Sequence, residues 1–234
     1  MEGFGAKILF EIPLFGGIPV TETVVNTWII MAVLTLFAVI ATRRFEAIPK
    51  GLQNVVEALV DVITGFTKQT MGEKKLVYAP YMLTLFLLLA FSNLFGLFGL
   101  RPPTADLNTT FAFAMLTFFI IHFNGISKKG PLTYAKGYLE PMAFMLPLNI
   151  IGELALPISL AFRLFGNIVG GMIIMSLIYS GLASASAAIG LSNLPILQVG
   201  VPAFLHLYFD VFSGLIQTFI FIMLSMVFIG NAYD

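Results

Sequence analysis

The 234-residue chain contains no cysteine, and only 10% of its residues are charged. The missing cysteines exclude disulfides, thiolate metal sites and a cysteine nucleophile, although they do not identify a compartment. Twelve basic residues balance twelve acidic ones, so no global charge points to nucleic acid or to an acidic substrate. Residues 1–17 lack a basic segment followed by a small-residue cleavage site, so we expect a retained tail.

Apolar side chains are in large excess. They make up 59% of the residues, and the mean hydropathy is +0.97. Soluble domains carry about 45–50% apolar residues. The composition therefore predicts an integral membrane protein.

The apolar segments predict an all-α, polytopic fold with about five membrane helices in one membrane domain, because a crossing helix needs roughly 20 residues. The predicted order is an outer tail (1–22), a span (23–42), an amphipathic surface helix (47–71), two spans (76–100 and 108–125), a cytoplasmic basic loop (126–140) and a hairpin (141–180 and 197–232). Each hairpin arm is nearly twice the length of a perpendicular crossing, so we expect both arms to tilt or bend. Residues 181–195, rich in Ala, Ser and Gly, are expected to form the outer turn.

The segment 51–71 differs from the spans because its apolar and polar residues fall on opposite helical faces. The apolar face holds Leu52, Val55, Val56, Leu59, Ile63 and Phe66. This pattern favours a helix on the membrane surface. The alternative is a helix packed on a soluble domain, but no such domain is visible in the sequence.

Basic residues are distributed unevenly along the chain. Residues 43–75 and 127–137 hold nine of the twelve lysines and arginines. The positive-inside rule therefore predicts that these segments and the C-terminus are cytoplasmic and that the N-terminus is outside.

Three ionisable residues, Glu153, Arg163 and Asp210, lie deep inside the last two apolar segments, with His206 beside Asp210. An unpaired charge in hydrocarbon costs about 3 kcal/mol on insertion scales and about 10 or more in simulations. Each charge must therefore face protein, water or a counter-charge.

Polar residues in each hairpin arm share one helical face at 100° per residue. The first face holds Asn149, Glu153, Arg163, Asn167, Gly170 and Gly171, and the second holds His206, Asp210, Ser213, Gly214 and Gln217. The two faces suggest a wet path between the helices.

Purely structural roles remain open for several of these residues. Glu153 and Arg163 could form an ion pair, and His206 and Asp210 a hydrogen bond between residues four apart. Asn149 and Gln217 could be interhelical hydrogen-bonding residues. His122, near the cytoplasmic end of its span, is expected to be an interfacial residue rather than a relay.

The segment Ser159-Leu-Ala-Phe-Arg-Leu-Phe-Gly-Asn167 closely resembles the signature of the a subunits of bacterial-type ATP synthases. Further segments resemble the same family in the same order: Pro103-Thr-Ala-Asp-Leu-Asn-Thr-Thr110, Ile121-His-Phe-Asn-Gly-Ile-Ser-Lys-Lys-Gly130, Ile151-Gly-Glu-Leu-Ala155 and Gly214-Leu-Ile-Gln-Thr-Phe-Ile-Phe221.

The resemblance implies a non-catalytic, ion-translocating stator subunit of the bacterial plasma membrane. Two half-channels and an arginine gate would couple flow of protons or Na⁺ to rotation of a ring of c subunits and to ATP synthesis. The implied partners are that c-ring, the b subunit of the peripheral stalk, the F1-sector ATPase subunits and the lipid bilayer. No cofactor or metal is implied. The implied ion-translocation residues are Arg163 as the gate, together with Asp210, Glu153, Asn167, Gln217, Asn149 and His206.

Two positions depart from the family pattern. Met172 stands where many relatives carry an acidic residue or histidine, so we expect Asp210 alone to supply the titratable group of the outer half-channel. Leu156 replaces a basic residue that is common in the family, which puts a second positive charge near the inner half-channel in doubt.

Two other classes compete with this interpretation. A stand-alone ion channel or secondary transporter would also place charges at the membrane midplane, but the chain shows no internal repeat. An intramembrane hydrolase using His206 and Asp210 lacks a Gly-x-Ser-x-Gly elbow, paired membrane aspartates and a His-Glu-x-x-His motif.

Overall fold

The computed structural model describes residues 5–13, 17–43, 46, 48–140, 142–190 and 196–233. Eight α-helices dominate this part of the chain: α1 (Glu22–Ala41), α2 (Leu52–Met71), α3 (Ala79–Leu94), α4 (Leu107–Lys129), α5 (Pro131–Gly137), α6 (Leu146–Ala188), α7 (Ile196–His206) and α8 (Gly214–Tyr233). A π-helical segment, Leu207–Ser213, joins α7 to α8. The short strands β1 (Ile8–Ile12) and β2 (Ile18–Thr21) form an antiparallel hairpin in the tail.

Among the described residues, five helical stretches are long and apolar enough to cross a membrane. They are Glu22–Ala41, Glu73–Phe98, Leu107–Lys129, Ala143–Ala188 and Gly200–Ala232, with mean hydropathies from 1.5 to 2.3. The prediction of an all-α, polytopic membrane protein is therefore confirmed.

The first arm of the hairpin is longer than expected. Helix α6 runs for 43 residues, or about 65 Å at about 1.5 Å per residue. It continues to Ala188 through the segment expected to turn, because alanine is the best helix former. Gly190, with φ +78°, follows its end, and residues 191–195 lie outside the described residues. The expected basic loop also differs, since α4 continues to Lys129 and α5 follows it.

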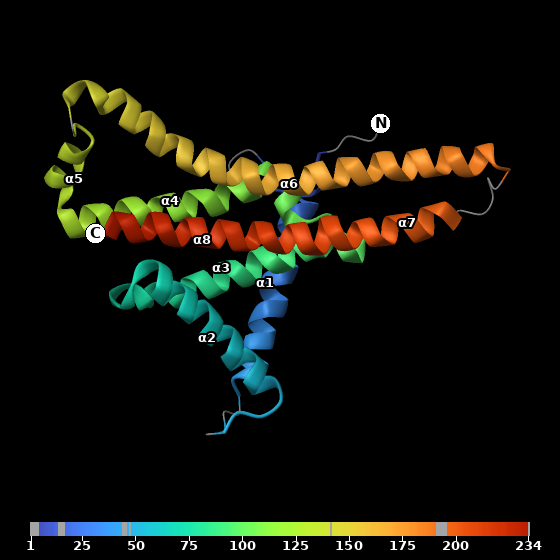
Figure 1. Cartoon of the computed structure of the whole chain (residues 1–234), viewed down its shortest axis with the longest axis horizontal. Coiled ribbons are helices and arrows are strands. Elements are labelled where there is room, and N and C mark those ends of the chain that lie inside the picture. Colours follow the sequence, from blue (N-terminus) through green and yellow to red (C-terminus); the bar gives the residue numbers. More distant parts are fainter. Residues whose placement is uncertain are drawn as a thin grey trace.

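Helices α4, α6 and α8 run alongside one another, and α7 continues the line of α8 beside the far half of α6 (Figure 1). The core that α4, α6 and α8 share with α3 includes Met82, Leu89, Ala114, Leu160, Ala161, Leu164, Ile222 and Met226. Ala114 and Ala161 are fully buried. Such small residues let membrane helices approach closely. The C-terminus lies at the end of the bundle where α4 meets α5 (Figure 1).

The amphipathic helix α2 is attached to this bundle by one half only. Ile63 and Met71 are buried in the shared core, where α2 packs on α3 and α8. Leu52 and Val55, in the other half, are more than half exposed. The observed contacts are therefore with the membrane helices, and the free apolar end is available to lipid.

Buried polar side chains also connect the helices. Asn93 on α3 donates to the carbonyl oxygen of Gly214 (2.8 Å) and to Thr218 Oγ1 (2.9 Å), and it accepts from Thr104 Oγ1 (2.7 Å). At the other end of the bundle, buried Lys75 donates to the carbonyl oxygen of Gly230 (2.8 Å). The Asn93 amide therefore fixes the start of α8 on α3.

We predict that Asn93→Leu destabilises the fold, because it leaves the buried Thr104 hydroxyl without its acceptor and removes one of the donors to the Gly214 carbonyl oxygen. The expected loss is about 1–3 kcal/mol in the free energy of unfolding, measured by SDS titration of the chain in lipid micelles. Asn108→Leu, at an exposed position, is the control. Equal stability of the two variants would contradict the assigned role of Asn93.

Candidate functional site

Arg163 lies near the middle of α6, and its side chain is exposed. Within the described part of the chain its guanidinium has no hydrogen bond and no ion pair, so the alternative of an ion pair with Glu153 is not realised. Arg163 lines a groove of about 290 Å³ with Gly152, Leu156 and Phe228. The isolated chain thus presents an uncovered cation on an apolar helix.

A cavity of about 520 Å³, which we name the α5 cavity, opens where α4, α5 and the start of α6 meet. Its polar lining consists of Lys129, Thr133, Tyr134, Tyr138, Glu140, Asn149 and Glu153. Asn149 Nδ2 donates to the carbonyl oxygens of Tyr138 (2.8 Å) and Glu140 (3.2 Å). Gly152 lines both this cavity and the groove of Arg163, so the two are neighbours on α6.

Glu153 faces a histidine on the neighbouring helix. Its Oε1 lies 3.8 Å from His122 Nε2, and the Tyr138 hydroxyl lies 3.4 Å from the same nitrogen. Burial, the hydrogen bond with Tyr134 and the charge of Glu153 together raise the pKa of Tyr138 far above its usual range. The Tyr138 phenol therefore stays protonated.

A second cavity of about 500 Å³, which we name the α7 cavity, lies between the C-terminal half of α6, the π-helical segment and the α3–α4 turn. Its lining includes Lys7, Glu22, Arg101, Met172, Tyr179, His206 and Asp210. Met172 lines this cavity with an apolar side chain, at the position where many relatives carry a titratable one. Asp210 was expected to be the only titratable residue here, but Lys7, Glu22 and His206 also line the cavity.

Asp210 is held by the histidine that precedes it by one turn. Its Oδ2 lies 2.6 Å from His206 Nδ1, and His206 Nε2 lies 3.1 Å from the hydroxyl of Tyr179 on α6. Asp210 lies within the π-helical segment. Such segments occur frequently at functional sites. The three side chains form a carboxylate–imidazole–phenol chain between the two arms of the hairpin.

Asn167 and Gln217 are the remaining predicted site residues. Asn167, one turn after Arg163, accepts a hydrogen bond from Ser213 Oγ at 2.9 Å. Gln217 on α8 is half-buried and makes no hydrogen bond with the described residues. Neither Asn167 nor Gln217 is among the lining residues of the two cavities.

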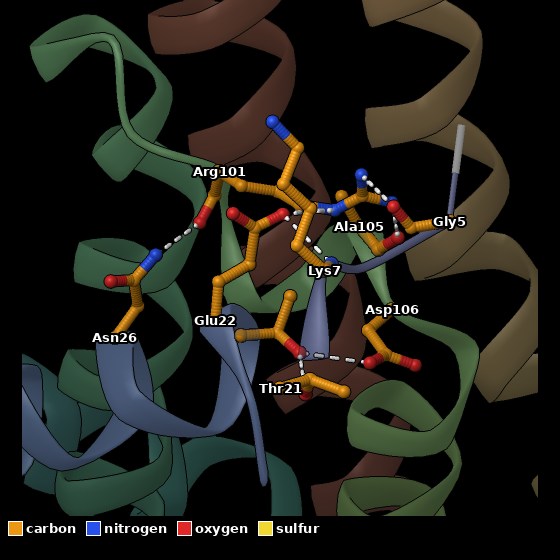
Figure 2. Close-up of polar contacts among 9 residues, drawn as sticks. Gly5, Lys7, Thr21, Glu22, Asn26, Arg101, Ala105 and Asp106 are labelled. Atoms are coloured by element: carbon orange, nitrogen blue, oxygen red, sulfur yellow. Dashed lines mark hydrogen bonds and ion pairs between the residues drawn. The ribbon is translucent and has the colours of Figure 1, made fainter. Parts of the chain in front are cut away.

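Figure 2 shows the polar contacts that fasten the tail to α1 and to the α3–α4 turn. Arg101 donates to the carbonyl oxygens of Gly5 (2.9 Å) and Ala105 (3.5 Å), and its Nε lies 3.8 Å from Glu22 Oε1. Asn26 donates to the carbonyl oxygen of Arg101 (2.9 Å). Arg101 therefore connects the tail, α1 and the α3–α4 turn. Arg101, Glu22 and Lys7 all line the α7 cavity.

Sequence reasoning did not find Tyr138, Tyr179, Glu22 or Arg101 as parts of the two cavities. Tyr179 is four turns beyond Arg163 on α6, and only the pairing of the hairpin arms places it on His206. Tyr138 follows α5, whose position depends on tertiary packing. For Glu22 and Arg101, the sequence does offer one signal of a functional position, which is a charged residue at the end of a membrane span.

The fold and these groups define a polytopic helical membrane protein that carries charged residues along its two longest helices, with a polar cavity toward each end of α6. The chain belongs to the ATP synthase A chain family, which matches it over residues 24–230.

Individual relatives resemble the chain over almost its whole length. The chain is 35% identical to the sodium-ion-specific ATP synthase subunit a of Propionigenium modestum, over 97% of this chain and 85% of that protein. It is 36% identical to ATP synthase subunit a of Moorella thermoacetica, over 94% of each. For the Geobacter sulfurreducens protein the identity is 36%, over 91% of this chain and 88% of the relative.

The two cavities are expected to open to opposite sides of the membrane. Because the chain has no native cysteine, single cysteines at Ser176 (α7 cavity) and Thr133 (α5 cavity) can be labelled with a membrane-impermeant thiol reagent in oriented vesicles. We predict labelling of each from one face only, and from opposite faces. Cysteine at Leu164, which is 1% exposed, is the control that neither side labels. Labelling of both cavities from the same face would contradict the assignment.

Proposed function

We propose how this chain, an ion-translocating stator subunit of an F-type ATP synthase by its family, couples ion flow to rotation. The α7 cavity is the outer half-channel, the α5 cavity is the inner half-channel, and Arg163 is the gate between them. The chain performs no chemical step of ATP synthesis. Its partners are a ring of small c subunits that each carry one carboxyl, the b subunit of the peripheral stalk and the soluble ATPase subunits.

The uncovered guanidinium of Arg163 carries this proposal. An arginine stays protonated even in an apolar environment, where a lysine could lose its proton. Exposed to hydrocarbon without a partner it would be costly, so another subunit must present a counter-charge. A carboxyl that passes from lipid to a position opposite Arg163 has its pKa lowered by the opposite charge and releases its ion.

The separation of the two cavities supports a gate rather than a continuous pore. The α5 cavity ends on α6 at Glu153, and the α7 cavity begins at Ile168, about 22 Å further along the helix. Their linings share no residue. A continuous pore would let ions cross without turning the ring, and the free energy of the membrane potential, about 2.3 kcal/mol per charge per 100 mV, would be lost. Ions must therefore travel between the cavities on the moving ring.

Each remaining site residue has a place in this path. Asp210 and His206 load or unload ions in the outer half-channel, and Asn167 and Gln217 line its approach to Arg163. Glu153 and Asn149 serve the inner half-channel.

The orientation of the chain in the membrane follows from the basic residues at one end of the helical bundle. The α5 cavity lies at the end that carries Lys128, Lys129 and Lys136, which the positive-inside rule assigns to the cytoplasm. The N-terminus is then outside and the C-terminus is cytoplasmic. We assign the protein to a bacterial plasma membrane on this basis and on its bacterial relatives.

Arg163→Ala is expected to abolish ion-driven ATP synthesis by the assembled complex, because no permanent charge would separate loading from release. Synthesis is measured in liposomes under an imposed ion gradient. Arg43→Ala, at an exposed position at the end of α1, is the control and should retain synthesis. Normal synthesis by Arg163→Ala would refute the proposal, and ion conduction by the chain alone would favour a stand-alone channel.

Asp210→Asn is predicted to slow synthesis by about tenfold or more, because it removes a carboxylate that can give and take protons. The dependence of the rate on outer pH should change as well, whereas its dependence on inner pH should not. Ser184→Ala, on the exposed far part of α6, is the control. An unchanged pH profile would mean that the His206–Asp210 hydrogen bond has a purely structural role.

A further inference from the structure

His122 lies outside the set of residues that the proposed function uses, yet its ring faces Glu153 across the boundary between α4 and α6. Building on that proposed function, we propose that His122 is a proton-relay residue that exchanges protons between Glu153 and the α5 cavity. The ion handled at this end of the path is therefore the proton and not Na⁺.

The hydrogen bonds of His122 determine which ring nitrogen can accept a proton. Nδ1 lies 2.9 Å from the carbonyl oxygen of Phe118. A carbonyl only accepts hydrogen bonds, so Nδ1 carries the hydrogen of the neutral ring. Nε2 is then left with its lone pair, and this is the nitrogen that faces Glu153 and Tyr138. The ring can take a second proton at Nε2 while its bond to Phe118 stays intact.

The groups around His122 leave Glu153 as its exchange partner. From α6 the ring meets Glu153, and from the segment at the end of α5 it meets Tyr138, whose hydroxyl contacts that of Tyr134 at 3.2 Å. Tyr138 keeps its proton, as described above, so it can only share a hydrogen bond. Lys129 and Glu140 line the same cavity further out.

The short helix α5 holds these tyrosines in place. Gly125 on α4 has no side chain, and any Cβ there would collide with the ring of Tyr134. Tyr134 therefore packs directly on the backbone of α4, less than one turn beyond His122. The aromatic contacts continue from Tyr134 to His122 and from His122 to Phe118. The imidazole is thus enclosed on one side and faces Glu153 on the other.

The transfer is a balanced exchange of one proton. A hydronium ion in the α5 cavity gives a proton to His122 Nε2 and becomes water, and the imidazolium then passes the proton to the Glu153 carboxylate, which leaves a neutral imidazole and a neutral carboxyl group. The reverse sequence returns the proton to the cavity. The 3.8 Å separation is too long for a direct hydrogen bond, so one water or a small rotation must close it.

This arrangement suits protons better than Na⁺. Hard cations prefer oxygen ligands, and an imidazolium beside Glu153 would repel them. The α7 cavity repeats the same three groups, with Asp210, His206 and Tyr179 in the places of Glu153, His122 and Tyr138. Each end of the path therefore pairs its carboxylate with an imidazole and a phenol.

The test uses the whole ATP synthase containing His122→Gln, reconstituted in liposomes and driven by a pH gradient. Gln keeps a polar side chain that cannot take up a proton. We expect synthesis to fall at least about tenfold, since general acid–base groups typically contribute about 10²–10⁴-fold. Added imidazole should restore it, in proportion to the pH-dependent fraction of imidazolium. Lys136→Gln, on an exposed position of α5, should behave as the unmodified complex.

Wild-type rates in His122→Gln, or a loss that imidazole does not restore, would overturn the relay. If His122→Gln does not assemble, Tyr138→Phe keeps the ring packing and removes only the hydroxyl next to Nε2. Its dependence on inner pH should shift, and an unchanged profile would also overturn the relay. Synthesis driven by a Na⁺ gradient in the presence of a protonophore would overturn it while leaving the gate at Arg163 intact, because only synthesis by Arg163→Ala contradicts the gate.

Discussion

The rest of the structure depends on one constraint, which is a permanent positive charge exposed on the apolar surface of α6. Arg163 has no counter-charge within the described part of its own chain. Since lipid cannot solvate a guanidinium, the chain requires a partner that brings a negative charge to this position. The long hairpin of α6, α7 and α8 presents Arg163 to that partner, and α3 and α4 pack against the hairpin and support it.

The polar groups of the hairpin are arranged in order along α6. Glu153 faces His122 at one end, Arg163 occupies the middle, and Tyr179 reaches the His206–Asp210 pair at the other end. Glu153 and Tyr179 are 26 residues apart on α6, or about 39 Å, which exceeds the roughly 30 Å thickness of the hydrocarbon layer, so a helix of one perpendicular crossing could not touch both groups. The length of α6 thus lets one element touch both cavities and still keep them apart.

Much of this architecture could be predicted from the sequence, because hydropathy and charge act locally. Apolar length gave the five membrane helices, and the cost of burying charge singled out Glu153, Arg163 and Asp210. Contacts between distant segments could not be predicted in the same way. No local pattern places Tyr138 near His122. The turn expected over residues 181–195 starts later than predicted, because its alanine-rich first part, to Ala188, continues α6.

The most direct test of the central claim asks what covers Arg163 in the assembled complex. Gly166, one turn further along α6, is exposed and has open space around its Cβ position, so a photo-crosslinking amino acid can be placed there. After irradiation, mass spectrometry identifies the attached species. The account predicts adducts with small two-helix membrane subunits, close to their carboxyl-bearing residue. Adducts with lipid alone, or with this chain alone, would contradict it.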